Sequence, residues 1–180
     1  MPLTFAQAMA RSFSKIYSPH KGVVAREALR RQGLKLVLTN GCFDLLHYDH
    51  VMFLRMARSY GDVLWVGLNS DESIRRLKGV GRPVFGLWHR GAILSAMESV
   101  SGICLFLEDT AAELIRELQP DIYVKGGDYT REEILATKEA LAVAEYGGRV
   151  EMAIKPTTIT TTDIIGRIRE DDTQADSGDR

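Results

Sequence analysis

The chain has 180 residues and a formal net charge of −1, which argues against binding nucleic acid or a membrane surface through bulk electrostatics. Its length suits one domain with a substantial core, and its two cysteines, Cys42 and Cys104, have neither metal-site nor disulfide-framework spacing. The apolar runs are short and broken by charges, so we expect a cytoplasmic protein without a membrane segment.

Residues 1–33 are expected to form an N-terminal extension with one helix. Residues 23–31 fit that helix, and Gly33 ends it. We expect its arginines to form a solvated face rather than to contact phosphates. The first strand is predicted at residues 34–38. After a loop and a helix, residues 62–69 form a second strand whose near-continuous apolar character indicates burial on both faces, as in a parallel sheet.

Further helices and strands alternate to the end of the chain. Residues 72–77, capped by Ser70 or Asp71, and residues 87–100 are predicted helices, and residues 103–107 form a third strand. Residues 110–113 and 130–133 have the pattern of capping boxes, opening one helix that ends at residue 118 and one that runs toward residue 146. Strands at 121–124 and 149–155 and a helix at 164–169 follow. Residues 170–180 are polar and acidic and are expected to be disordered.

Five strands alternating with helices predict an α/β protein with a five-stranded, doubly wound parallel sheet of the Rossmann-like kind. In such sheets ligands bind beyond the carboxyl ends of the strands, where the strand order reverses. The chemically suggestive residues of this chain fall in the loops at those ends, namely 40–50, 69–82, 125–129 and 156–162. We therefore expect these loops to gather around one site.

Two histidines, His47 and His50, stand three residues apart where the first strand passes into a helix. At this spacing both imidazoles share one face of the first helical turn, where free backbone N–H groups and the helix dipole attract anions. The pattern predicts a phosphate site. Asp44 is expected to turn the preceding loop by accepting hydrogen bonds from backbone amides, and Tyr48 and Tyr129 are expected to pack or to line the rim.

Several motifs occur together in one order: Thr39-Asn40-Gly41-Cys42-Phe43-Asp44-x-x-His47-x-x-His50, Val66 to Asp71, Arg76-Leu77-Lys78-Gly79, Gly81-Arg82-Pro83, Val124 to Tyr129 and Thr160-Thr161-Thr162. Together they resemble the cytidylyltransferase-like nucleotidyltransferases, and within them the heptose 1-phosphate adenylyltransferase domain of the bifunctional heptose kinase and adenylyltransferase. The resemblance covers residues 34–169, which we take as the nucleotidyltransferase domain.

This resemblance implies transfer of AMP from ATP to a sugar 1-phosphate, with release of pyrophosphate and with Mg²⁺ on the triphosphate. A phosphate nucleophile is already ionised near neutral pH, so catalysis consists of positioning and of neutralising charge. No protein ligand for a metal is assigned, and homodimerisation is expected from the resemblance alone. CTP with another phosphorylated polyol or sugar is the alternative within the same class.

The resemblance also assigns roles by position. The expected catalytic residues are His47, His50 and Lys125. Lys78, Arg82, Lys125 and Gly126 are expected to bind the sugar phosphate. The expected nucleotide-binding residues are Thr39, Asn40, Gly41, Cys42, Phe43, Asn69, Arg90, Gly127, Asp128, Thr160, Thr161 and Thr162. We do not expect Cys42 to act as a nucleophile, because the transfer needs no covalent step.

Two positions depart from the family pattern. Asp49 stands where glycine normally precedes the second histidine, and Trp88 stands where relatives often carry an acidic residue. As an N-cap, Asp49 would occupy N–H groups that a phosphate needs. One unit of repulsion at roughly 5 Å and an effective dielectric of about 20 is on the order of 3 kcal/mol, enough to cost about a hundredfold unless Mg²⁺ relieves it. A catalytically weak nucleotide-binding homologue is therefore a further alternative. Trp88 could stack on a base, cover the site or simply pack.

Overall fold

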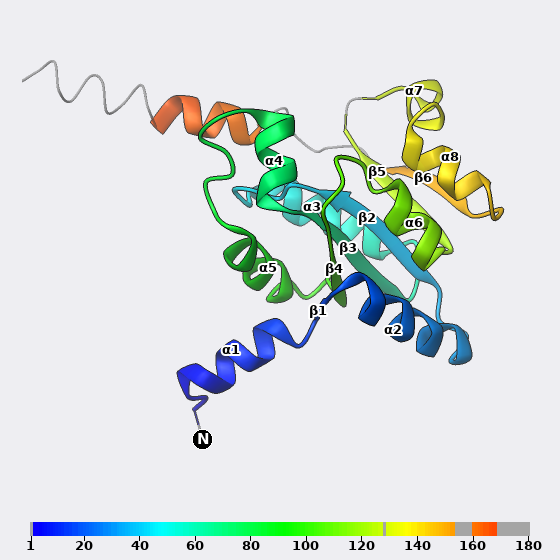
Figure 1. The fold of residues 1–180 in the computed structure, drawn as a ribbon, viewed down its shortest axis with the longest axis horizontal. Helices are drawn as coiled ribbons and strands as arrows, with labels where there is room; N and C mark the ends of the chain where they lie inside the picture. Colours follow the sequence, from blue (N-terminus) through cyan, green and yellow to red (C-terminus); the bar gives the residue numbers. More distant parts are fainter. Residues whose placement is uncertain (1, 128, 154–159, 169–180) are drawn as a thin grey trace, which may run out of the picture.

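The computed structural model describes residues 2–127, 129–153 and 160–168. The predictions for Asp128, for residues 154–159 and for the tail at 170–180 lie outside these residues. The chain forms an α/β structure around one parallel sheet (Figure 1), as the sequence predicts. No helix in the described segments is both long and apolar enough to cross a membrane.

Six parallel strands make up the sheet: β1 (Ile16–Tyr17), β2 (Leu36–Gly41), β3 (Val63–Asn69), β4 (Gly102–Phe106), β5 (Ile122–Gly126) and β6 (Arg149–Ala153). They lie in the order β1-β4-β3-β2-β5-β6. All five predicted strands are present, and a short sixth strand, β1, is added at the edge by residues of the N-terminal segment, where Ile16 pairs with Ile103. The order reverses between β2 and β5, which is the switch point of the sheet.

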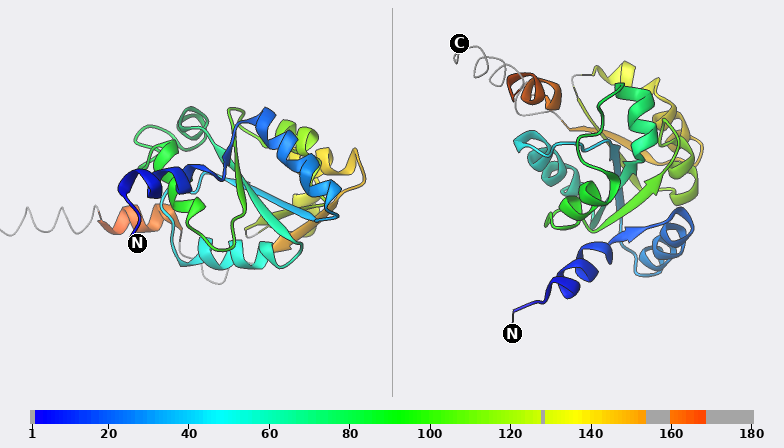
Figure 2. Two further views of the ribbon diagram at one scale, coloured as in Figure 1. Left: turned by 90° about the horizontal axis from the view of Figure 1, so that it is seen from below. Right: turned by 60° about the vertical axis from the view of Figure 1, so that its left-hand side comes forward.

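The helices are α1 (Phe5–Phe13), α2 (Pro19–Arg31), α3 (Tyr48–Arg58), α4 (Asp71–Lys78), α5 (Leu87–Ser95), α6 (Ala112–Leu118), α7 (Arg131–Leu135) and α8 (Lys138–Ala144). Residues 161–168 are also helical. Figure 2 shows α3 on one side of the sheet and α2, α6 and α8 on the other. Because both faces are covered, the strands in between carry apolar side chains on both sides.

Two apolar cores follow from this layering. One joins Val37 and Val66 of the sheet to Phe53 and Leu54 of α3 and Leu94 of α5. The other joins the opposite sheet face to α6 and α8, with Leu36, Leu38, Trp65, Ile115 and Val143 among its members. Leu36, Leu38, Val37 and Val66 have no exposed surface. The central strand β2 is therefore buried between the two cores, and the loop that follows it starts from this buried strand.

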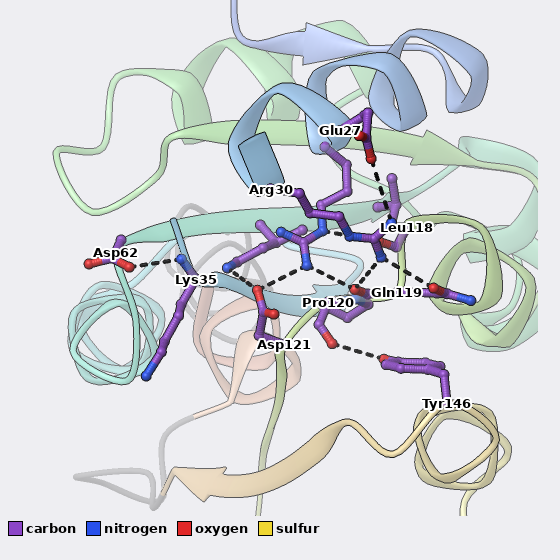
Figure 3. Close-up of polar contacts among 11 residues, drawn as sticks. Glu27, Arg30, Lys35, Asp62, Leu118, Gln119, Pro120, Asp121 and Tyr146 are labelled. Carbon is purple, nitrogen blue, oxygen red and sulfur yellow. Dashed lines mark hydrogen bonds and ion pairs between the residues drawn. The ribbon is translucent and has the colours of Figure 1, made fainter. Parts of the chain in front are cut away.

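Among the α2 arginines that we expected on a solvated face, Arg30 and Arg31 are exposed, whereas Arg26 is buried. Arg26 is only 3% exposed and donates to the carbonyls of Leu118 and Gln119 and to the carboxylate of Asp121. Carbonyls at a helix end lack intrahelical partners, so Arg26 is buried in order to satisfy those of α6. Figure 3 shows this region, including the contacts of Arg30 with Gln119 and of Tyr146 with Pro120.

Helix boundaries show where local patterns succeed and fail. Thr130 and Glu133 form the predicted capping box of α7, and Ser70 caps α4. The capping box predicted from Thr110 is wrong: α6 has Ala111 as its N-cap residue, without a side-chain cap. The buried carboxylate of Glu139 accepts the hydrogen bond of the Ala111 N–H instead. A side chain distant in sequence thus replaces the local cap.

Candidate active site at the switch point

A cavity of about 630 Å³ lies at the carboxyl ends of the central strands. It is lined by residues from β2 and its loop, from β3 and α4, from β5 and from the start of the helix at 161–168. The lining residues include Asn40, Gly41, Cys42, Phe43, His47, His50, Asn69, Lys78, Arg82, Lys125, Gly126, Thr160, Thr161 and Thr162. The fold therefore brings these predicted site residues together around one space, although they come from four separate loops.

The loop after β2 contributes several residues to the lining of the cavity. Phe43 has a positive φ of 43°, a conformation that non-glycine residues rarely adopt outside turns, and its ring is buried. The ring centroids of His47 and His50 lie 4.1 Å apart, and His50 also lies against Phe43, at 5.3 Å between centroids. The two imidazoles are thus neighbours on one face of the first turn, as their spacing predicts.

Helix α3 begins at Tyr48, and His47 is its N-cap residue. The expectation that Asp49 caps the helix is therefore wrong: Asp49 is the second residue of the helix, 2% exposed, and it lines the cavity. The side chain of His47 makes no capping hydrogen bond. The first N–H groups of a helix have no intrahelical acceptor, so this turn can donate to an anion in the cavity.

The end of β5 brings Lys125 and Gly126 to the opposite side of the switch point. A Cβ atom added to Gly126 would lie 2.5 Å from the ring of Phe53 in α3, so glycine at this position lets β5 and α3 pack closely. Gly127 has a φ of 143°, a conformation that favours glycine. Tyr129, predicted to pack or to line the rim, lines the cavity and is 48% exposed.

Thr160 precedes the helix at residues 161–168. Its backbone N–H and hydroxyl donate to Asp163 Oδ2 at 2.7 and 2.6 Å, and the Asp163 N–H donates to Thr160 Oγ1 at 3.2 Å. These hydrogen bonds hold the pKa of Asp163 below its usual range. The Thr161 hydroxyl donates to the carbonyl of Leu45 at 3.4 Å. The threonine segment is thereby joined to the loop that carries the histidines.

Asn40 and Asn69 project from adjacent strands, and hydrogen bonds fix the orientation of both side chains. The buried Tyr123 donates its hydroxyl to Asn40 Oδ1 at 2.6 Å, which leaves the Asn40 amide nitrogen to act as a donor. Asn69 Nδ2 donates to Ser73 Oγ at 3.0 Å, and that hydroxyl donates to the carbonyl of Glu108. Sequence reasoning missed Tyr123, because its burial within β5 gives the appearance of an ordinary core residue.

Three of the predicted nucleotide-binding residues, Thr39, Arg90 and Gly127, are not among the described residues that line the cavity. Thr39 and Arg90 are each 1% exposed. Arg90 donates to the carbonyls of Phe85, Cys42 and Asn69 and to the carboxylate of Asp71. It therefore ties together the chain segments that surround the cavity.

The remaining features concern reactivity and packing. Burial raises the pKa of the Cys42 thiol, and nearby Lys78 and Arg90 oppose this effect; a protonated thiol is a poor nucleophile. The described residues contain no group of three or more His, Cys, Asp or Glu side chains arranged to hold a metal ion. Trp88 contacts Phe13 of α1 edge to face, at 5.7 Å between centroids, so in this structure it packs against α1.

The fold and the cavity define a Rossmann-like α/β protein whose polar crevice lies at a topological switch point, where such folds bind nucleotides. The sequence model of the cytidylyltransferase-like family matches residues 38–167. The chain belongs to this family.

Similar proteins extend the comparison. Over 143 residues the chain is 50% identical to bifunctional protein HldE of Geotalea uraniireducens, a match covering 79% of this chain and 29% of that protein. It is 46% identical over 165 residues to bifunctional protein HldE of Pelobacter propionicus, covering 92% and 33%, and 40% identical over 172 residues to that of Pseudomonas aeruginosa, covering 92% and 36%. The chain thus spans about a third of the length of these relatives.

Among solved structures, a lipopolysaccharide core biosynthesis protein from Thermoplasma volcanium shares the fold, with a TM-score of 0.57, 24% identity, and coverage of 71% of this chain and 100% of the other. Pantoate-beta-alanine ligase from Francisella tularensis also shares it, with a TM-score of 0.53, 13% identity, and coverage of 83% and 74%.

Proposed function

We propose that this protein is a nucleotidyltransferase that transfers AMP from ATP to a sugar 1-phosphate of the heptose 1-phosphate type and releases pyrophosphate. The observation that carries the proposal is the meeting of His47, His50, Lys125 and Thr160–Thr162 around one cavity at the switch point. The motifs that resemble the heptose 1-phosphate adenylyltransferase domain support the sugar-phosphate substrate, and the chain is 50% and 46% identical to two proteins named bifunctional protein HldE. In the reaction, an oxygen of the sugar phosphate forms a bond to the α-phosphorus while the bond to pyrophosphate breaks.

The residues of the cavity supply what this transfer needs. The first turn of α3 offers backbone N–H groups to the phosphates, and the imidazoles of His47 and His50 lie beside it. Lys125 approaches from β5 across the switch point, and the hydroxyls of Thr161 and Thr162 border the same space. Donors fixed in advance toward developing negative charge stabilise it at no further reorganisation cost.

Mg²⁺ is the proposed cofactor. It prefers six oxygen ligands and is usually held by substrate phosphates with one or two carboxylates and water. Asp49 lines the same cavity as His47 and His50, so one carboxylate together with the phosphates fits that ligand set. When bound, Mg²⁺ supplies neutralisation of phosphate charge. Homodimerisation and a cytoplasmic location stay predictions that derive from the resemblance and the composition.

A second candidate function follows from Asp49 itself. Because this residue is 2% exposed and lines the cavity, its charge cannot be moved into bulk water when phosphates enter. Without relief by Mg²⁺, the repulsion estimated at about 3 kcal/mol would leave a protein that binds nucleotides weakly and turns them over slowly. In that case removal of the carboxylate should increase turnover.

The test is pyrophosphate release by the wild-type protein with Mg²⁺, each of the four NTPs and a panel of sugar 1-phosphates, heptose 1-phosphates included. Turnover with ATP and a sugar 1-phosphate supports the proposal, and a preference for CTP with another phosphorylated polyol or sugar supports the alternative substrate pair. If the wild type binds nucleotides without turnover, and Asp49→Gly and Asp49→Asn both restore turnover, the result supports the weak homologue. The matched control is Glu98→Gln, because Glu98 is an exposed acidic residue away from the cavity. Absence of NTP binding refutes both candidates.

A further inference from the structure

Asp44 connects two segments of the cavity wall that are far apart in sequence. It follows the turn after β2 and is 4% exposed. Its Oδ1 atom accepts hydrogen bonds from the backbone N–H groups of Val84, at 2.7 Å, and Phe85, at 3.1 Å. Its Oδ2 atom lies 3.1 Å from Nη1 of Arg82. Asp44 thus holds the chain between α4 and α5 rather than its own loop.

The segment that Asp44 holds is otherwise open on the side of α4. Gly79 and Gly81 have φ values of 89° and 86°, with no atom within 4 Å of an added Cβ, and Val80 is fully exposed. Beyond them, the side chain of Arg82 is only 15% exposed and lines the cavity. An exposed, glycine-rich stretch therefore leads directly into an anchored arginine.

The contact between Asp44 and Arg82 has the distance of an ion pair, while neither Oδ2 nor Nη1 has hydrogen-bond geometry toward a described residue. The guanidinium carries five N–H donors in a planar fork. An attraction through one of its nitrogens fixes the position of the group and leaves further donors for a phosphate, which arginine binds in a bidentate manner. Both Asp44 oxygens are engaged by protein atoms, so its carboxylate is not placed to act on a substrate.

We propose that Asp44 is a positioning residue, which keeps the guanidinium of Arg82 in the cavity wall so that it meets a phosphate of the bound substrates. This inference rests on the proposed function, because it names a determinant of phosphate binding in the same site. The backbone hydrogen bonds of Val84 and Phe85 fix the chain, and the negative charge of Asp44 fixes the side chain. An arginine on the same segment without this partner would sample many rotamers in solvent.

The test is a double-mutant cycle with Asp44→Asn and Arg82→Ala. Asparagine keeps an oxygen for the two backbone N–H groups and removes the charge that faces Arg82. We expect Asp44→Asn to raise KM for one of the two substrates by about tenfold with kcat within about threefold, since uniform phosphate binding is lost. In the Arg82→Ala background, Asp44→Asn should raise the same KM by less than about twofold, because the effects of coupled residues are not additive. An equal rise in KM in both backgrounds, or no rise in either, overturns the proposal.

A second measurement does not depend on activity. Trypsin cleaves after Lys78, which borders the exposed glycines, and we expect the ligand-free Asp44→Asn protein to be cut there several-fold faster than the wild type, because local opening controls proteolysis. Glu145→Gln, which breaks the exposed ion pair with Arg116, is the matched control and should not change the rate. Equal cleavage of Asp44→Asn and wild type contradicts anchoring by the Asp44 charge.

The two proposals can fail separately. If the wild-type protein releases no pyrophosphate but binds NTP, the proposed function fails, and the cycle is measured on the NTP dissociation constant with the same expected coupling. If the wild type neither binds nor turns over nucleotides, the role of Asp44 in phosphate binding is refuted as well, whatever trypsin shows about the segment.

Discussion

Substitution of Arg90 by methionine separates two roles for this residue. The resemblance implies that Arg90 binds the nucleotide, whereas its side chain in α5 has no exposed surface. Nε donates to Phe85 O at 3.0 Å, Nη1 to Cys42 O at 2.7 Å, and Nη2 to Asn69 O and Asp71 Oδ1 at 2.8 and 2.7 Å. Methionine fills much of the same volume without any donor, so it removes these bonds and little packing.

The expected loss of stability follows from these contacts. Removing one partner of a buried ion pair typically costs about 3–5 kcal/mol. The side chain of Asp71 is 32% exposed, so water can solvate part of its charge in the variant, and we take the lower end, about 3 kcal/mol. At roughly 2–4 °C for each kcal/mol in a chain of this size, Arg90→Met should lower Tm by about 6–12 °C.

The assay is thermal unfolding followed by circular dichroism, with NTP binding measured well below Tm. The control is Arg55→Met, because Arg55 is an exposed arginine on α3. This variant should melt within about 1 °C of the wild type. If Arg90→Met keeps the wild-type Tm while NTP binding is lost, the reasoning from burial is refuted and Arg90 contacts the nucleotide directly.

Three other predictions concern single side chains. His50→Ala should lower turnover at least about a hundredfold with Tm nearly unchanged, because the half-buried ring faces the cavity; steady-state rates and melting curves check this. Tyr123→Phe should cost about 1 kcal/mol of stability by urea unfolding and weaken NTP binding in calorimetry, because Asn40 loses the hydrogen bond that orients it. Burial raises the pKa of Cys42 and raises that of Cys104 to about 12, so both thiols stay protonated near neutral pH. Alkylation by iodoacetamide should then be slow near neutral pH and should need a more alkaline pH than an unperturbed thiol does.

The five long strands could be predicted because their signal is local. Runs such as residues 63–68 are continuously apolar, and a parallel sheet covered on both sides buries such runs. The switch point follows once the strands alternate with helices, so the meeting of the histidine loop, Lys125 and the threonines was within reach of the sequence. Strand β1 could not be predicted, because two residues are too few to show a hydrophobic pattern. Its pairing with β4 also depends on a partner that is distant in sequence.

The errors at helix ends have the same origin. Asp49 has a strong intrinsic preference for an N-cap position, yet His47 takes that position because the turn containing Phe43 fixes where α3 begins. The predicted helix toward Tyr146 divides into α7 and α8, since Thr137 accepts a hydrogen bond from the Ala140 N–H and caps a new helix. Propensity ranks the candidates for a cap, while tertiary packing selects among them.

The hydrogen bonds of Arg90 show which contacts a local sequence pattern cannot predict. Its acceptors stand before it at separations of 5, 19, 21 and 48 residues, so no window of local sequence includes them together. An arginine near a nucleotide site is ordinarily taken as a ligand for phosphate. In the structure, carbonyls and one carboxylate surround Arg90, and these are acceptors that a buried guanidinium requires.

Asp49 lines the cavity and is 2% exposed, so its carboxylate bears on how a triphosphate would bind there. Asp49 lies among the imidazoles and the helix N–H groups, where the triphosphate is proposed to bind. If Asp49 helps to hold Mg²⁺, the ion would neutralise phosphate charge there and Asp49→Asn should lower turnover. If no ion is held, the carboxylate and the phosphates should repel each other and Asp49→Asn should raise turnover.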